Sequence, residues 1–180
     1  TTLSNYLSKK SKKLCKEKIF ILETGTAKGF SAICMAKALK DNNKDGLIVT
    51  FDVIPHNIKM FWNSISDIIN GPQTRAQLLQ NWKSLCQKYI LFHQGDTRLE
   101  LAKVQVERIH FAFLDGAHTY NDVIFEFNQI QNKQNPGDMI VYNDYSQKKF
   151  PGIVKAVDEI CKNNNYNKEI IRSSSERAYV

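Results

Sequence analysis

Two short segments carry most of the residues that could perform acid–base or metal chemistry. One holds Asp115 and, three residues later, His118, and the other ends on Asn143 and Asp144. Histidine titrates near neutrality, so His118 is a candidate general base, with a hydrogen-bonded loop histidine as the alternative. Asp115, Asn143 and Asp144 would offer only oxygen ligands, which suit Mg²⁺ or another hard divalent cation rather than zinc. Asp144 is the better ligand candidate, whereas Asn143 could instead shape the loop.

A glycine-containing segment, residues 23–29, lies between an apolar run and a helical pattern that starts at Phe30. Glycines let the backbone turn sharply and approach a ligand, and free N–H groups at a helix start favour an anionic group such as a carboxylate. The binding candidates in this segment are Glu23, Thr24, Gly25, Thr26 and Gly29. The dinucleotide fingerprint G-x-G-x-x-G is not met, because Ala27 stands at the place of its second glycine. NAD or FAD binding is therefore disfavoured.

Acidic residues follow two further apolar runs. Asp52, beside Val53, ends the second run, where its carboxylate could accept hydrogen bonds from the hydroxyls of a nucleoside ribose. A solvated aspartate in a strand-end loop is the alternative. Gly95 and Asp96 follow the third run, where the polar side chain could lie beside an adenine. Asp96 could instead cap a helix that starts close behind it.

Five short, continuously apolar runs must position these residues. They are residues 19–22, 47–51, 89–92, 109–114 and 139–142. Continuous apolarity is typical of strands buried on both faces, and thus of a parallel sheet covered by helices. Between the runs, apolar residues recur three or four apart, as in amphipathic helices. The pattern predicts an α/β fold with a doubly wound, mostly parallel, Rossmann-like sheet, which binds ligands beyond the carboxyl ends of its strands.

The tail and one long connection depart from this alternation. Residues 168–172 and 177–180 flank a turn-forming stretch and predict a C-terminal antiparallel hairpin, which would bring the sheet to about seven strands. Residues 55–88 form an unusually long connection, part of which we expect to be a lid over the ligand. Within it we interpret Arg75 as a surface charge, with contact to an acidic acceptor as the alternative.

Three further histidines have weaker functional claims. His56 follows the second run and could reach a nucleoside or an acceptor. His93 and His110 lie in or beside apolar runs, so we interpret them as core or edge residues.

Composition limits the remaining possibilities. The chain has 180 residues, of which 42% are hydrophobic, and we interpret residues 1–180 as a single domain. The net charge of +7 is concentrated in residues 1–18, predicted to be a basic helix with a solvated face, because no aromatic residues are interleaved to stack on bases. Four widely spaced cysteines predict reduced thiols and a cytoplasmic location. No apolar stretch approaches the roughly 20 residues that span a bilayer.

The residues at the strand ends, taken together, resemble those of class I S-adenosylmethionine-dependent methyltransferases. Residues 23–29, Asp52 and Asp96 carry that resemblance, which extends over the whole chain. The segments 114–120, with D-G-x-H-x-Y, and 136–144, with P-G-x-x-I-V-x-x-D, resemble the branch that contains macrocin O-methyltransferase and cephalosporin hydroxylase-like proteins. The pairing of these two segments is more specific than the glycine segment alone.

This resemblance implies S-adenosylmethionine as the methyl donor and a hydroxyl of a small molecule or sugar as the acceptor. Donor binding is then expected at residues 23–29, Asp52, Val53, Gly95, Asp96 and Asp115. His118, Asp115 and Asp144 are the expected catalytic residues, because transfer to a hydroxyl requires a base or a metal beside the acceptor oxygen. A divalent cation such as Mg²⁺ is implied at Asp115, Asn143 and Asp144, and a homodimer is an open alternative to a monomer.

Two alternatives stay open. The positive charge favours a nucleic-acid methyltransferase, but adenine-N6 enzymes of this fold carry N-P-P-Y-like residues where this chain has Asp115 to His118. A non-catalytic nucleoside-binding module would keep the donor site alone, and the acids and histidine at the fourth and fifth strand ends argue against it.

Overall fold

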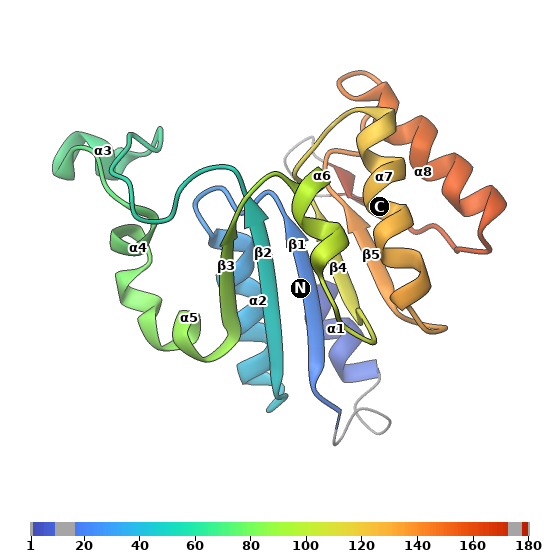
Figure 1. Ribbon diagram of the computed structural model, residues 1–180, viewed down its shortest axis with the longest axis horizontal. Coiled ribbons are helices and arrows are strands. Elements are labelled where there is room, and N and C mark those ends of the chain that lie inside the picture. Colours follow the sequence, from blue (N-terminus) through green and yellow to red (C-terminus); the bar gives the residue numbers. More distant parts are fainter. Residues whose placement is uncertain (1, 10–16, 173–177, 180) are drawn as a thin grey trace.

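The molecule is built around a five-stranded parallel sheet (Figure 1). The computed structural model describes residues 2–9, 17–172 and 178–179. The strands are β1 (Ile19–Thr24), β2 (Gly46–Asp52), β3 (Ile90–Gln94), β4 (Phe111–Leu114) and β5 (Met139–Tyr142), in the spatial order β3-β2-β1-β4-β5. The five apolar runs of the sequence thus form the five strands, and the predicted α/β, Rossmann-like class is confirmed.

Helices lie on both faces of the sheet. Figure 1 shows α1 (Thr2–Lys9) and α2 (Phe30–Asp41) on one side, and α7 (Tyr120–Ile130) and α8 (Pro151–Asn163) on the other. The side of α2 also receives α5 (Lys83–Tyr89). The short helix α6 (Thr97–Glu100) follows β3, and 3-10 turns lie at Gln80–Trp82, Leu101–Lys103 and Gln131–Lys133.

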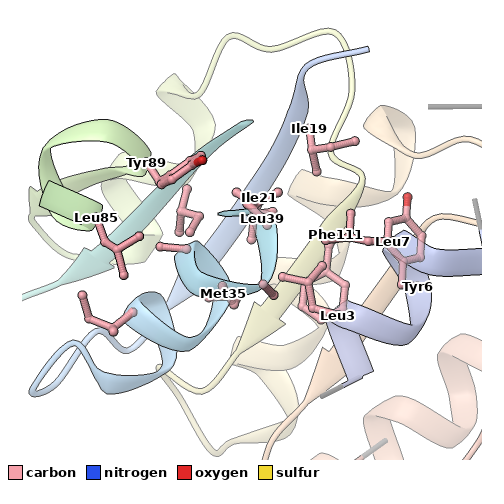
Figure 2. Close-up of a cluster of buried hydrophobic side chains, with 14 of the residues drawn as sticks. Leu3, Tyr6, Leu7, Ile19, Ile21, Met35, Leu39, Leu85, Tyr89 and Phe111 are labelled. Carbon is pink, nitrogen blue, oxygen red and sulfur yellow. The ribbon is translucent and has the colours of Figure 1, made fainter. Parts of the chain in front are cut away.

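Alternate residues of β1, β2, β4 and β5 enter two separate cores, whereas the edge strand β3 contributes only to the first. In β1, Ile21 packs with α2 and α5, whereas its neighbour Leu22 packs with α7 and α8. Figure 2 shows the first core, where Leu39 and Met35 of α2 face Ile21. This two-sided burial is the physical reason for the continuous apolarity of the strands.

The direction in which the chain crosses the sheet reverses at β1. β1 pairs with β2 on one side and with β4 on the other. β2 and β3 therefore extend the sheet from one side of β1, and β4 and β5 extend it from the other. Parallel sheets of this kind form their ligand crevice at such a reversal, outside the carboxyl ends of the strands. The ends of β1 and β4 are therefore where the site is to be sought.

The predicted sheet of about seven strands is wrong for the described residues. The C-terminal segments β6 (Ile171–Arg172) and β7 (Ala178–Tyr179) are two residues long each and pair antiparallel only with one another, in a separate sheet. The turn-forming stretch expected between them lies outside the described residues. Two-residue strands offer too few ladder hydrogen bonds and too little apolar surface to extend the main sheet.

Only part of the predicted basic helix over residues 1–18, with its solvated face, falls within the described residues. Helix α1 is described only as far as Lys9, and it buries Leu3, Tyr6 and Leu7 against the first core. Residues 17–18 are not helical. Most of the lysine cluster falls at residues 10–16, outside the described part.

The long connection is folded. It contains α3 (Ile65–Asn70), α4 (Arg75–Leu78) and α5, and it is closed by a bridge in which Met60 and Gln73 exchange backbone hydrogen bonds. In Figure 1, α3 stands out beside the β3 edge, away from β4 and β5. Within the described residues, no helix is long and apolar enough to cross a bilayer.

The first core yields a prediction about stability. Leu39 is fully buried, so Leu39→Ala should lower the free energy of unfolding by about 3 kcal/mol, through lost transfer energy and the cavity left behind. Leu99, on α6, is 66% exposed, and Leu99→Ala should cost less than about 0.5 kcal/mol. Urea titration of both variants measures the difference. Equal losses would contradict the placement of α2 on the sheet.

Candidate functional site

The turn after β1 is pressed against the end of β4. Gly25 has φ +82°, a left-handed conformation, and a Cβ there would lie 2.4 Å from the carbonyl oxygen of Asp115. The Gly25 N–H donates to the Phe51 carbonyl at 2.9 Å, which anchors the turn to β2. Gly29, also left-handed, starts α2, and a Cβ there would meet Leu79 of the long connection at 2.8 Å. The backbone angle favours glycine at both positions, and at Gly25 the close approach of the Asp115 backbone also excludes a side chain.

Three of the predicted donor-binding side chains lie beneath this turn. Glu23 and Thr24 are fully buried, and Thr26 nearly so. The Thr50 hydroxyl donates to Glu23 Oε2, and the hydroxyls of Thr26 and Thr50 lie 2.6 Å apart. These side chains support the turn and do not line its outer surface.

A hollow of about 280 Å³ opens beside the turn, at the carboxyl ends of β1, β2 and β3. Five predicted site residues line it, namely Gly25, Asp52, Val53, Gly95 and Asp96. Sequence reasoning missed the remaining lining residues, Phe51, Thr97, Arg98, Gly116, Ala117 and Asp122. All of them except Asp122 are close in sequence to a predicted site residue, and this closeness was the only sign of their role in the sequence. Asp122 reaches the hollow from α7.

Asp52 sits at the back of this hollow with both carboxylate oxygens engaged. Oδ2 accepts the Ala27 N–H at 2.6 Å, and Oδ1 accepts the Ile54 N–H at 2.9 Å. Arg75 Nη2 lies 3.5 Å from Oδ2. Oδ2 therefore has two donors, whereas Oδ1 has one and keeps a second lone pair that can accept a hydroxyl donor.

The interpretation of Arg75 as a surface charge is wrong. Its side chain is buried, and its Nε donates to the Ala27 carbonyl at 2.6 Å. A lone cation in the sequence gave no sign of this, because the partners are backbone carbonyls and an aspartate 23 residues away.

Asp96 performs the capping role that the sequence left as an alternative. Its carboxylate accepts the Arg98 N–H at 2.9 Å, at the start of α6. The preceding Gly95 donates its N–H to the Asp52 carbonyl at 2.9 Å, which ties the ends of β2 and β3 together. Arg98 in turn forms an ion pair with Asp122 of α7 across the hollow.

Asp115, His118 and Asp144 converge next to the glycine turn. His118 Nε2 lies 3.4 Å from Asp144 Oδ2 and 4.0 Å from Asp115 Oδ1. One ligand atom from each residue falls within 4.8 Å of the others. All three side chains are partly exposed, and the His118 ring rests against Phe150, with ring centroids 4.6 Å apart. This is the pair of segments singled out in the sequence, brought together by the β4–β5 pairing.

Asn143 is buried beside this cluster, and its amide nitrogen donates to Asp115 Oδ1 at 2.6 Å. The atom that faces Asp115 is therefore a donor, which cannot bind a cation. Its Oδ1 is buried with no hydrogen-bond partner in the described part of the chain. This geometry favours the loop-shaping role over the ligand role.

Two buried glutamates surround the site from inside the protein. Burial raises the pKa of Glu23 from 4.5 to about 7, opposed by hydrogen bonds from Ser31 and Thr50 and augmented by the charges of Asp115 and Asp52. Burial likewise raises the pKa of Glu126, on α7, to about 7. Glu126 was not anticipated, because its helical position resembles any solvated glutamate until α7 packs on the sheet.

The other histidines lie away from the cluster. His93 Nε2 is 2.9 Å from Glu100, and the buried His110 accepts the Phe20 N–H at 3.1 Å, as expected of edge and core residues. His56 stacks on Phe92 at 4.5 Å and lines a separate cavity of about 520 Å³ beside α4 and α5. Burial lowers the pKa of His56, and the charge of Arg75 lowers it further.

Comparison with known proteins agrees with this fold. Residues 22–145 match the family described as a methyltransferase domain, and the chain belongs to that family. The match begins within β1, ends just after Asp144 and includes every predicted site residue. Comparison with curated proteins found no match.

Several solved structures share the fold over 99% of the chain. The O-methyltransferase NovP has a TM-score of 0.70 at 16% identity, with 76% of its own chain covered. The apo calicheamicin-biosynthesis enzyme CalS11, a TDP-rhamnose 3'-O-methyltransferase, has 0.64 at 14%, with 78% covered. TomG from Streptomyces achromogenes, an O-methyltransferase in complex with S-adenosylmethionine, has 0.66 at 16%, with 77% covered.

The buried Glu23 yields a pH prediction. Its pKa of about 7 in the folded protein exceeds its ordinary 4.5, so the folded state binds the extra proton between these values. Stability from this group is therefore present below pH 4.5 and lost as the pH rises through 7. Glutamine at this position cannot ionise, so Glu23→Gln should reduce the loss of unfolding free energy with rising pH by about 3 kcal/mol.

Urea unfolding at intervals from pH 5 to pH 8 measures this difference. The exposed Glu107 provides the control, because Glu107→Gln should keep the wild-type decline. Parallel curves for the two variants would show that Glu23 ionisation is not linked to folding.

Proposed function

We propose that this chain is an S-adenosylmethionine-dependent methyltransferase that methylates an oxygen of a small molecule or sugar. One observation carries the proposal, namely that the hollow beside the glycine turn is continuous with the segment that holds Asp115 and His118. Gly25 and Asp52 line the hollow from one side, and Gly116 and Ala117 line it from the other. A donor held at the turn would thus have its reactive end directed toward the acid–histidine cluster.

The donor site assigned here uses two sets of residues. Asp52 accepts the ribose hydroxyls, Val53 and Asp96 flank the adenine, and Gly25 and Gly95 permit close approach of the backbone. Glu23, Thr24, Thr26 and Gly29 act from beneath or behind by fixing the turn. Asp115 borders both the donor and the acceptor, since its carbonyl touches the turn and its carboxylate joins the cluster.

Methyl transfer requires an acceptor oxygen in line with the donor's methyl–sulfur bond. The oxygen forms the new bond to the methyl carbon, the electron pair of the broken bond returns to sulfur, and the hydroxyl proton leaves. His118 Nε2 accepts that proton as general base. Asp144 and Asp115, at 3.4 and 4.0 Å from Nε2, stabilise the imidazolium that results.

A divalent cation fits the same cluster. Two carboxylates and a histidine with ligand atoms within 4.8 Å form an adequate donor set, with Asp115 and Asp144 as oxygen ligands. When bound, such a cation would lower the pKa of an acceptor hydroxyl. Asn143 would orient Asp115 through its amide and not ligate directly.

The similar structures support the choice of acceptor. NovP and TomG are O-methyltransferases, and CalS11 methylates a sugar nucleotide hydroxyl. A nucleic-acid acceptor is less favoured, because Asp115-Gly116-Ala117-His118 stands where adenine-N6 enzymes carry their own motif. Cytoplasmic location and homodimer formation stay predictions of the sequence.

Calorimetric titration with S-adenosylmethionine and S-adenosylhomocysteine, with NAD as control, tests the donor assignment. We expect micromolar binding of S-adenosylmethionine or S-adenosylhomocysteine. Asp52→Ala should weaken this binding by about tenfold or more, because hydrogen bonds to the ribose are lost. Asp41→Ala removes an exposed aspartate and should bind like wild type. Asp52→Asn serves if the alanine variant does not fold.

Preference for NAD, or no binding by folded wild-type protein, would overturn the proposed function. Equal donor affinity in wild type and Asp52→Ala would remove only the ribose assignment.

His118→Ala separates binding from chemistry. Donor affinity should stay within about twofold of wild type, whereas formation of S-adenosylhomocysteine with TDP-sugars and small hydroxylated acceptors should fall by about 100-fold or more. The same assay with and without Mg²⁺, in wild type and Asp144→Asn, tests the cation. Undiminished turnover in His118→Ala would overturn the assignment of His118 as general base. Turnover unaffected by chelators would overturn the proposed role of a metal.

A further inference from the structure

Arg75 is a buried cation whose partners all belong to other parts of the fold. It begins α4 in the long connection, yet only 2% of it is exposed. Burying an arginine is costly unless its N–H groups are paired. Nε donates to the Ala27 carbonyl at 2.6 Å, and Nη2 donates to the Ile54 carbonyl at 3.2 Å. One guanidinium therefore joins the glycine turn to the segment that follows β2.

The same guanidinium stands behind Asp52. Nη2 lies 3.5 Å from Asp52 Oδ2, the oxygen that also accepts the Ala27 N–H. Ala27 is thus held twice, through its N–H by Asp52 and through its carbonyl by Arg75. Ala27 has φ +45°, an unfavourable angle for a residue with a side chain, so this local conformation depends on outside support.

On its other side, Arg75 is packed into the long connection. Its guanidinium carbon lies 5.6 Å from the ring centroid of Trp62, a cation–π contact. Trp62 is buried, and its Nε1–H donates to the Gln73 carbonyl at 2.7 Å, beside the bridge between Met60 and Gln73. Thr74 and Gln77 form a capping box that fixes the start of α4 and therefore the direction of Arg75.

We infer that Arg75 is a positioning residue that couples the folding of the connection, from Met60 to Leu78, to the placement of Asp52 and Ala27. Asp52, which Arg75 positions, would bind the nucleoside part of the methyl donor, so the inference rests on the proposed function. Coupling of this kind is reciprocal, so donor binding at Asp52 also stabilises the connection.

Lysine cannot replace Arg75 in this arrangement. The planar guanidinium reaches two carbonyls and a carboxylate from one fixed fork, whereas an ammonium offers its donors at a single point. Arg75→Lys should therefore recover only part of what Arg75→Met loses. This comparison separates fork geometry from charge alone.

The chain provides its own reporter. It contains two tryptophans, and Trp82 is 42% exposed, so Trp82→Phe leaves Trp62, beside Arg75, as the single tryptophan. Arg108 is a matched control, since it forms a bidentate ion pair with Asp138. That pair lies just before β4 and β5, at the amino ends of these strands, whereas the site lies beyond their carboxyl ends. Arg108→Met should reduce stability without changing Trp62 or the donor site.

The first arm of the experiment needs no donor. In the Trp82→Phe background, Arg75→Met should shift Trp62 emission to the red and speed hydrogen exchange at the amides of Ala27 and Ile54, which report on Asp52. Arg108→Met should change none of these signals. Unchanged signals in folded Arg75→Met would overturn the coupling.

The second arm measures S-adenosylmethionine affinity by calorimetry. Arg75→Met should weaken binding by about tenfold or more, Arg75→Lys by less, and Arg108→Met by under about twofold. In an Asp52→Asn background, the effect of Arg75→Met should shrink to about twofold, because the two residues act through one carboxylate.

The outcomes distinguish the inference from the proposed function. Normal donor affinity in Arg75→Met, with wild type binding the donor, would reduce Arg75 to a purely structural residue and overturn its positioning role. Absence of donor binding in wild type would overturn the proposed function, while the first arm still decides whether Arg75 couples the connection to Asp52.

Discussion

The contact between the glycine turn and the end of β4 is the constraint on which the site depends. At Gly25 a side chain would strike the Asp115 carbonyl at 2.4 Å, so only glycine lets the two strand ends approach this closely. The contact occurs where the order of strands reverses, with β2 on one side of β1 and β4 on the other. It holds the hollow beside Asp52 next to the segment that carries Asp115.

Buried polar groups surround this contact and determine its electrostatics. Glu23 and Glu126 lie within the protein with raised pKa values, because burial disfavours their charged forms. Arg75 is a buried positive charge on the side of the long connection, where it pairs with backbone carbonyls and with Asp52. The site therefore rests on groups that are costly to bury. Glu23 accepts a hydrogen bond from Thr50 of β2, and Arg75 donates to the carbonyls of Ala27 and Ile54, so these two groups have partners from other parts of the fold. Such dependence ties the local conformation of the turn to the integrity of the whole domain.

Strand ends were predictable from sequence because their determinants are local. Continuous apolarity located all five strands, and the position after each strand located Asp52, Asp96, Asp115 and Asp144. The cap formed by Asp96 was also foreseeable, since capping depends on residues within one helical turn. The size of the sheet was not, because strand pairing in the tail depends on long-range contacts that a two-residue segment cannot form.

The sequence by itself determined the fold class, the strand-end position of the acidic residues and the family, since each follows from periodicity or from residues close together in the chain. Only the tertiary structure decided which side chains line the hollow and which support it from beneath. Glu23 and Thr26 face inward because β1 and β2 pair in a particular register, and Asn143 turns its amide to Asp115 because β5 pairs with β4. Arg75 shows the difference most clearly, because its burial depends on carbonyls of residues 27 and 54, which no pattern within the chain relates to it.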